Sequence, residues 1–134
     1  MSYIIYPYIG VNSIRFGMTK EEIHSELGKP ETTFMRDASD NTGETDEYKD
    51  FFVSYDEEGR CEAIEFFELA DVILNEKAVF TGTYDEICGL FDDIEEDDTG
   101  FTEYKYGIGV YAPNKDEDVC CSEAVIVFKK GYYD

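Results

Sequence analysis

Two stretches of the chain place apolar residues at helical spacing directly behind a helix-capping motif. In the first, Thr19 and Glu22 have the spacing at which a hydroxyl and a carboxylate satisfy the unpaired backbone N–H groups of a helix start. Ile23 and Leu27 then share one helical face, and Gly-Lys-Pro at 28–30 is a stop signal. We therefore predict a short helix between the cap and this stop.

The second stretch repeats that pattern in the middle of the chain. Thr83 and Glu86 form a second capping box, and Ile87, Leu90 and Phe91 form the apolar stripe behind it. We expect this helix to end before the acidic run at 92–98.

Extended segments rich in aromatic and β-branched residues follow each predicted helix, and two more precede the helices. A turn sequence at 56–59 predicts an antiparallel hairpin between two of them. The segment at 37–46 is polar and is expected to be a loop. The predicted strands are approximately 31–36, 48–56 and 60–69 after the first helix and 101–111 and 122–129 after the second, with 3–16 and 72–80 leading into the helices.

The chain also contains an internal repeat. Three blocks match in the same order along the sequence: residues 16–23 with 80–87, 47–55 with 103–111, and 62–67 with 123–128. Each copy would be a helix followed by strands, with repeats at approximately 9–69 and 73–130 inside one domain, 1–134. The predicted fold class is α+β, in which the two tandem units form one antiparallel sheet of about six to eight strands with both helices on one face.

The charge of the chain is strongly negative and unevenly distributed. Against 11 basic residues there are 32 acidic ones, giving a net charge of −21 in 134 residues. Residues 1–34 hold only three basic and four acidic residues, so the rest of the chain carries −20 of that charge. A field of this sign repels nucleic acid and anionic membranes and favours capture of a basic protein surface. A merely solvated acidic surface is the alternative interpretation.

The remaining bulk features favour a cytoplasmic protein. No segment reaches the ~20 apolar residues of a membrane span, and the first residues lack the basic region and cleavage site of a secretion signal. The four cysteines have no CxxC spacing, which favours reduced and mostly buried thiols.

No residues in the sequence have the spacing of a catalytic or cofactor-binding motif. No carboxylate pair has a partner histidine or nucleophile at a diagnostic spacing, and no glycine-rich phosphate loop precedes a helix. His24, the one histidine, is expected at the edge of the exposed helix face. The sequence therefore predicts no enzyme, no cofactor and no metal site, although weak calcium binding at 92–98 is left open.

Exposed tyrosines beside carboxylates are typical of protein interfaces. The chain has 11 tyrosines and 10 phenylalanines without tryptophan, and alternation puts aromatic residues on both faces of the predicted strands. The alternative is that these rings complete the core. The candidate partner-binding residues are Tyr48, Tyr55, Asp92, Asp93, Glu95, Glu96, Asp97, Asp98, Tyr104, Tyr106, Asp116, Glu117 and Asp118.

Residues 16–30 (FGMTKEEIHSELGKP) resemble the opening helix of small outer-membrane assembly lipoproteins of the SmpA/OmlA type. The doubled unit is similar to the tandem architecture of β-lactamase inhibitory protein. Pro7, Gly10, Ile14 and Gly17-Met18, with the closing residues 127–133, also resemble bacterial immunity proteins encoded beside polymorphic toxins. These resemblances imply recognition of a protein through a sheet face.

The sequence as a whole favours a non-enzymatic acidic protein-binding domain, such as an inhibitor or immunity protein that neutralises a basic toxin or nuclease domain. The alternative is a small-ligand or calcium-binding module that uses the open sheet face.

Overall fold

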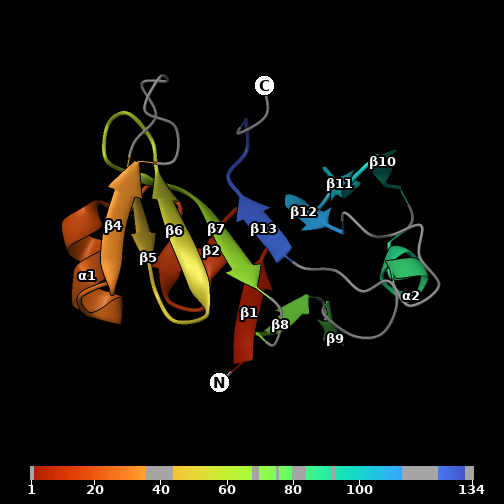
Figure 1. Cartoon of the computed structure of the whole chain (residues 1–134), viewed down its shortest axis with the longest axis horizontal. Coiled ribbons are helices and arrows are strands. Elements are labelled where there is room, and N and C mark those ends of the chain that lie inside the picture. The colour runs from red at the N-terminus through yellow and green to blue at the C-terminus, as the bar shows by residue number, and fades with distance from the viewer. Residues whose placement is uncertain are drawn as a thin grey trace.

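The computed structural model describes residues 2–35, 44–67, 70–74, 76–79, 84–91, 93–112 and 124–131. Within this part of the chain the fold is built mainly from two β-sheets (Figure 1). The larger has eight antiparallel strands in the order β10-β11-β12-β13-β7-β6-β5-β4. Its strands are β4 (Thr32–Met35), β5 (Glu44–Glu47), β6 (Phe51–Tyr55), β7 (Cys61–Phe67), β10 (Glu95–Asp97), β11 (Gly100–Glu103), β12 (Ile108–Tyr111) and β13 (Ala124–Phe128).

The smaller sheet has five strands in the order β3-β2-β1-β8-β9. Two short hairpins, β2 with β3 and β8 with β9, lie on either side of β1, which pairs parallel with β8 and antiparallel with β2. The strands are β1 (Ser2–Tyr6), β2 (Gly10–Val11), β3 (Ile14–Arg15), β8 (Asp71–Leu74) and β9 (Lys77–Ala78).

Two helices complete the described structure. α1 (Lys20–Leu27) lies at the β4 end of the larger sheet and α2 (Tyr84–Cys88) at the β10 end (Figure 1). The capping box of α1 is present, with Thr19 and Glu22 each accepting a hydrogen bond from the other's backbone N–H, and the helix ends at Gly28. Thr83 of the second predicted cap lies outside the described residues. Neither helix is long and apolar enough to cross a membrane, within the described residues.

One apolar core lies between the two sheets. On one face of the larger sheet Phe51, Phe66, Val125, Val110 and Phe101 follow one another across neighbouring strands, and all are buried. Buried side chains of the five-stranded sheet belong to the same cluster, as do Ile23 of α1 and Ile87 of α2. We call the opposite face of the larger sheet the outer face.

The predicted α+β fold class is wrong, because the layer that covers the larger sheet is mostly a second sheet. The segments predicted as strands at 3–16 and 72–80 do contain strands, but these belong to the second sheet, where β1 pairs with β8, and not to two helix-plus-strand units. The helices have only eight and five residues, so they cannot cover an eight-stranded sheet alone. The hairpin predicted around 56–59 is confirmed as β6–β7.

The internal duplication stays a proposal, to which the strand order adds support. Four strands from residues 32–67 and four from residues 95–128 meet at the β7–β13 pair. That pair is centred on Glu65 and Ile126, which are aligned in the third sequence match. Tyr55 and Tyr111, aligned in the second match, have different environments: Tyr55 is 2% exposed and Tyr111 is 47% exposed.

Candidate functional site

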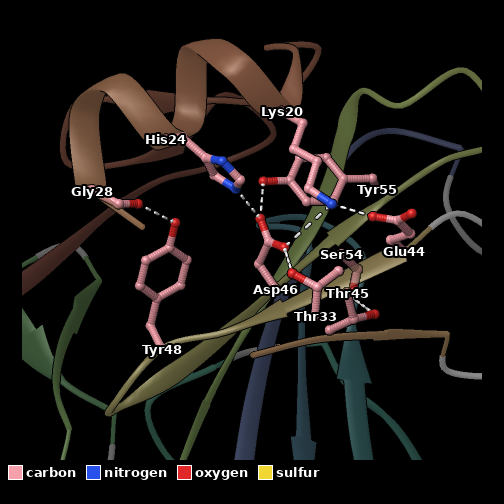
Figure 2. Close-up of polar contacts among 10 residues, drawn as sticks. All are labelled: Lys20, His24, Gly28, Thr33, Glu44, Thr45, Asp46, Tyr48, Ser54 and Tyr55. Carbon is pink, nitrogen blue, oxygen red and sulfur yellow. Dashed lines mark hydrogen bonds and ion pairs between the residues drawn. The ribbon is translucent and has the colours of Figure 1, made fainter. Parts of the chain in front are cut away.

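A buried carboxylate holds α1 against the larger sheet. Asp46 on β5 is fully buried and receives side chains from three other elements (Figure 2). Tyr55 of β6 donates its hydroxyl to Asp46 Oδ2 at 2.8 Å, and Thr33 of β4 donates to Oδ1 at 2.7 Å. From α1, His24 Nε2 lies 2.7 Å from Oδ2 and Lys20 Nζ lies 3.6 Å from Oδ1. We call these five residues the Asp46 network.

The network keeps its carboxylate ionised in spite of burial. Burial alone would raise the pKa of Asp46, but hydrogen bonds from Thr33, His24 and Tyr55 and the charge of Lys20 together lower the pKa below its ordinary value. Burial and the hydrogen bond to Asp46 raise the pKa of Tyr55 far above 10, so its hydroxyl stays protonated. Nothing among these groups supplies a nucleophile next to the histidine, so the geometry is that of a structural network.

Sequence reasoning does not find this network, because the polar segment at 37–46, which includes Asp46, predicts a loop. His24 is predicted at an exposed edge of the helix, whereas its Nε2 lies 2.7 Å from Asp46 Oδ2 on the sheet. The one available signal was the spacing of Lys20 and His24, which puts two basic side chains on one face of the helix.

The outer face of the larger sheet carries a row of half-buried phenylalanines. Phe34, Phe52 and Phe67 come from β4, β6 and β7, and their rings touch edge-on, with centroids 5.4 Å apart for the first pair and 4.6 Å for the second. We call them the aromatic row. Their side chains point away from the core because Phe52 alternates with buried Phe51 and Val53 along β6.

Next to the aromatic row the outer face is hollowed. Phe52 pairs with Glu65, and Phe67 with Ala124, at the border of a cavity of about 280 Å³. Gly109 has no side chain to fill this space, and a Cβ added there would lie only 3.0 Å from Cγ2 of Ile126, its neighbour across the strands. We call this cavity the acidic hollow; besides Gly109 it is lined by Glu65, Asp97, Thr99, Phe101, Thr102, Val110, Tyr111, Ala124 and Ile126.

Two groups at the acidic hollow are placed for contact with a ligand. Asp97 Oδ1 accepts hydrogen bonds from the backbone N–H of Thr99 at 2.8 Å and from its hydroxyl at 3.2 Å, which orients the carboxylate. Tyr111 is 47% exposed and lies on the other side of Gly100 from Asp97, since both residues pair with that glycine. A carboxylate and an aromatic face are the two groups that bind a guanidinium or ammonium group in proteins.

The predicted interface residues differ in how deeply the structure buries them. Tyr55 is internal, and Tyr48 is half-buried, stacked on Phe51 at 5.1 Å and bonded to the Gly28 carbonyl at 2.9 Å. Tyr106 is half-buried near Phe91. These three rings complete the core or its margin, which was the alternative interpretation of the tyrosines.

The other candidates lie at the surface or outside the described residues. Tyr104 is 46% exposed, and Asp93 is exposed. All residues of β10, together with Asp98, are exposed, so the edge of the larger sheet next to the acidic hollow is uniformly acidic. Asp92 and residues 116–118 lie outside the described part of the chain. In the described part no group of three histidine, cysteine, aspartate or glutamate side chains is arranged to hold a metal ion.

Comparisons with models of protein families, with curated proteins and with solved structures gave no match for this chain. The geometry and charge of its surfaces are therefore the basis for assigning a function.

Proposed function

We propose that this chain is a non-enzymatic, cytoplasmic protein-binding domain that inhibits a basic partner, such as a toxin or nuclease domain, through its outer face. The observation that carries the proposal is the acidic hollow. It has an oriented carboxylate, a half-exposed tyrosine and a glycine floor, and it lies directly beside the aromatic row.

The two parts of this surface suit two kinds of side chain on a partner. The acidic hollow has the charge and the depth for one lysine or arginine side chain, and the aromatic row offers apolar area for neighbouring side chains. The net charge of −21 would steer a basic protein toward this face from a distance. The acidic edge strand β10 opposes edge-to-edge pairing with a second copy of the chain, because like charges would face each other.

The test is affinity capture of partners from the source cell at low ionic strength, with matched variants. Asp97→Asn removes a charge and keeps an acceptor for Thr99, while Gly109→Val fills the acidic hollow. Glu58→Gln removes one charge at the exposed turn between β6 and β7 and serves as the control.

We expect wild type and the control to retain a basic protein that moderate salt elutes. Both hollow variants should retain at least about tenfold less, which corresponds to about 1.4 kcal/mol. Recovery of no basic protein at low salt would refute the proposal. Equal capture by all four proteins would also refute the assignment of the site.

A further inference from the structure

A second cavity, of about 410 Å³, lies on the opposite side of β6 and β7 from the outer face. It opens where the last turn of α1, the β2–β3 turn and the β5–β6 turn come together. We call it the end cleft. Its floor is made by Phe51, Ile64 and Phe66, which alternate along their strands with the outer-face residues Phe52 and Glu65.

Aromatic rings form the walls of the end cleft. Tyr3 of β1 lies 5.4 Å from Phe51 and 4.9 Å from Phe66 between ring centroids, and Tyr48 stacks on Phe51 at 5.1 Å. The lining is therefore predominantly apolar, and its volume falls within the roughly 300–1,000 Å³ of small-molecule sites. It suits one aromatic ring with a short chain.

The walls are held in place without a ligand. The Tyr48 hydroxyl donates to the carbonyl of Gly28, where α1 ends, so the β5–β6 turn is tied to the helix. The Tyr3 hydroxyl donates to Oδ2 of Asp50, in the same β5–β6 turn, at 3.4 Å. Because both tyrosines are already anchored, a ligand would enter a site that needs little rearrangement.

Charge determines which small molecule fits. Two carboxylates, Glu26 and Asp50, lie at the mouth of the end cleft with one cation, Lys49. The chain as a whole carries −21, so the surrounding potential excludes anions and attracts cations. The faces of Tyr3 and Tyr48 add a cation–π contribution to a positive group at the mouth.

We propose that the end cleft binds a small arylalkylammonium molecule, with its aromatic ring between the tyrosines and its protonated amine against Glu26 and Asp50. This site is separate from the acidic hollow, since its residues point to the other face of β6 and β7. The two proposals can therefore fail independently.

The test is titration followed by nuclear magnetic resonance with three probes of one shape: 2-phenylethylammonium, 2-phenylethanol and 3-phenylpropionate. We expect saturable shifts at the cleft residues for the ammonium, with at least tenfold weaker binding of the propionate and intermediate binding of the alcohol. Equal affinity for the three probes, or no saturable shift with the ammonium, would overturn the proposal. Chemical-shift changes that depend on the protein concentration and not on the probe concentration would overturn the proposal in favour of self-association.

Variants test the apolar cavity and the carboxylates at its mouth separately. Ser13→Trp places a bulky ring at the mouth from an exposed turn position, and should weaken ammonium binding at least tenfold while circular dichroism stays unchanged. The double variant Glu26→Gln/Asp50→Asn should bring the affinities for the ammonium and the propionate close together. The matched control Glu57→Gln/Glu58→Gln, which removes two carboxylates from a distant turn, should keep the tenfold preference. Unchanged preference in the Glu26/Asp50 variant would overturn the assignment.

Discussion

Replacing Asp46 by alanine removes the acceptor that four side chains share. Tyr55 is the donor that suffers most, because it is 2% exposed and its hydroxyl would be left without a partner or water. An unsatisfied buried group of this kind costs about 1–3 kcal/mol. Lys20 and His24 have side chains 32% exposed and can be rehydrated, so each adds well under ~1 kcal/mol.

The free energy of unfolding should therefore fall by about 3 kcal/mol in Asp46→Ala. This estimate lies at the lower end of the roughly 3–5 kcal/mol seen when one partner of a buried ion pair is removed. Tyr55→Phe removes the donor and leaves Asp46 with its other partners, so it should lose only about 1 kcal/mol. The surface variant Glu44→Ala, whose side chain is 51% exposed, should lose less than about 0.5 kcal/mol.

Urea unfolding followed by far-ultraviolet circular dichroism measures these differences. In the double variant Asp46→Ala/Tyr55→Phe the total loss should be smaller than the sum of the single losses by about 1 kcal/mol, because the same hydrogen bond is removed twice. A loss below about 1 kcal/mol in Asp46→Ala, or strict additivity in the double variant, would refute the role assigned to the network.

Three further predictions follow from the charges and the burial. First, the pKa of Asp46 is lowered in the folded state, so its stabilising effect is complete above its unfolded pKa of about 3.9 and is lost as pH falls through the folded value. The difference in unfolding free energy between wild type and Asp46→Asn should therefore shrink on acidification below about pH 4. A constant difference in urea titrations would contradict this. Second, sodium chloride should raise Tm by several degrees, because it screens the self-repulsion of a chain with net charge −21; an unchanged Tm in calorimetry would argue against that repulsion. Third, burial raises the pKa of the fully buried Cys61 thiol to about 12, so the peptide that contains it should stay unlabelled by iodoacetamide at pH 8 until the protein unfolds, as mass spectrometry can establish.

Local signals in the sequence predicted the local parts of the fold. The cap and the stop of α1 are encoded within about ten residues, and the β6–β7 hairpin has its turn sequence between two apolar runs. The five-stranded sheet has no such signal, because β2, β3 and β9 have two residues each. Its central pairing joins Ser2 to Asp71, a contact that neither segment encodes alone.

The candidate site was only partly predictable for the same reason. The acidic character of residues 95–98 could be read from composition, but the acidic hollow depends on Gly109 and Tyr111 lying between strands from distant parts of the chain. The register of the second sequence match was also misleading, since Tyr55 and Tyr111 are aligned but only Tyr55 is buried. A shift of one residue sends a strand side chain to the opposite face, and sequence similarity alone does not fix that register.

The two halves of the larger sheet differ under their helices, and this difference bears on the end cleft. Phe101 in the second half of the sheet occupies the place that Asp46 has in the first half. Asp46 pairs with Val53, which pairs with Ile64. In the same way Phe101 pairs with Val110, which pairs with Val125, and Ile64 and Val125 are aligned in the third sequence match. Phe101 packs against Phe91, which lies three residues beyond the end of α2, at 5.7 Å between ring centroids, so the contact here is apolar. An apolar contact tolerates small shifts of a helix, whereas a carboxylate with several donors requires one position.

Because the Asp46 network fixes the position of α1, it also affects the residues at the other end of this helix. Lys20 and His24 bind Asp46, and the carbonyl of Gly28 at the end of the same helix holds Tyr48 in the wall of the end cleft. Asp46 does not line the cleft, yet Asp46→Ala should weaken binding of 2-phenylethylammonium severalfold, because α1 loses its fixed register. The isosteric Asp46→Asn, which keeps an acceptor, should weaken binding less. If ammonium affinity is unchanged in Asp46→Ala while stability falls, burial of Ile23 alone positions the helix, and the network stabilises the fold without shaping the cleft.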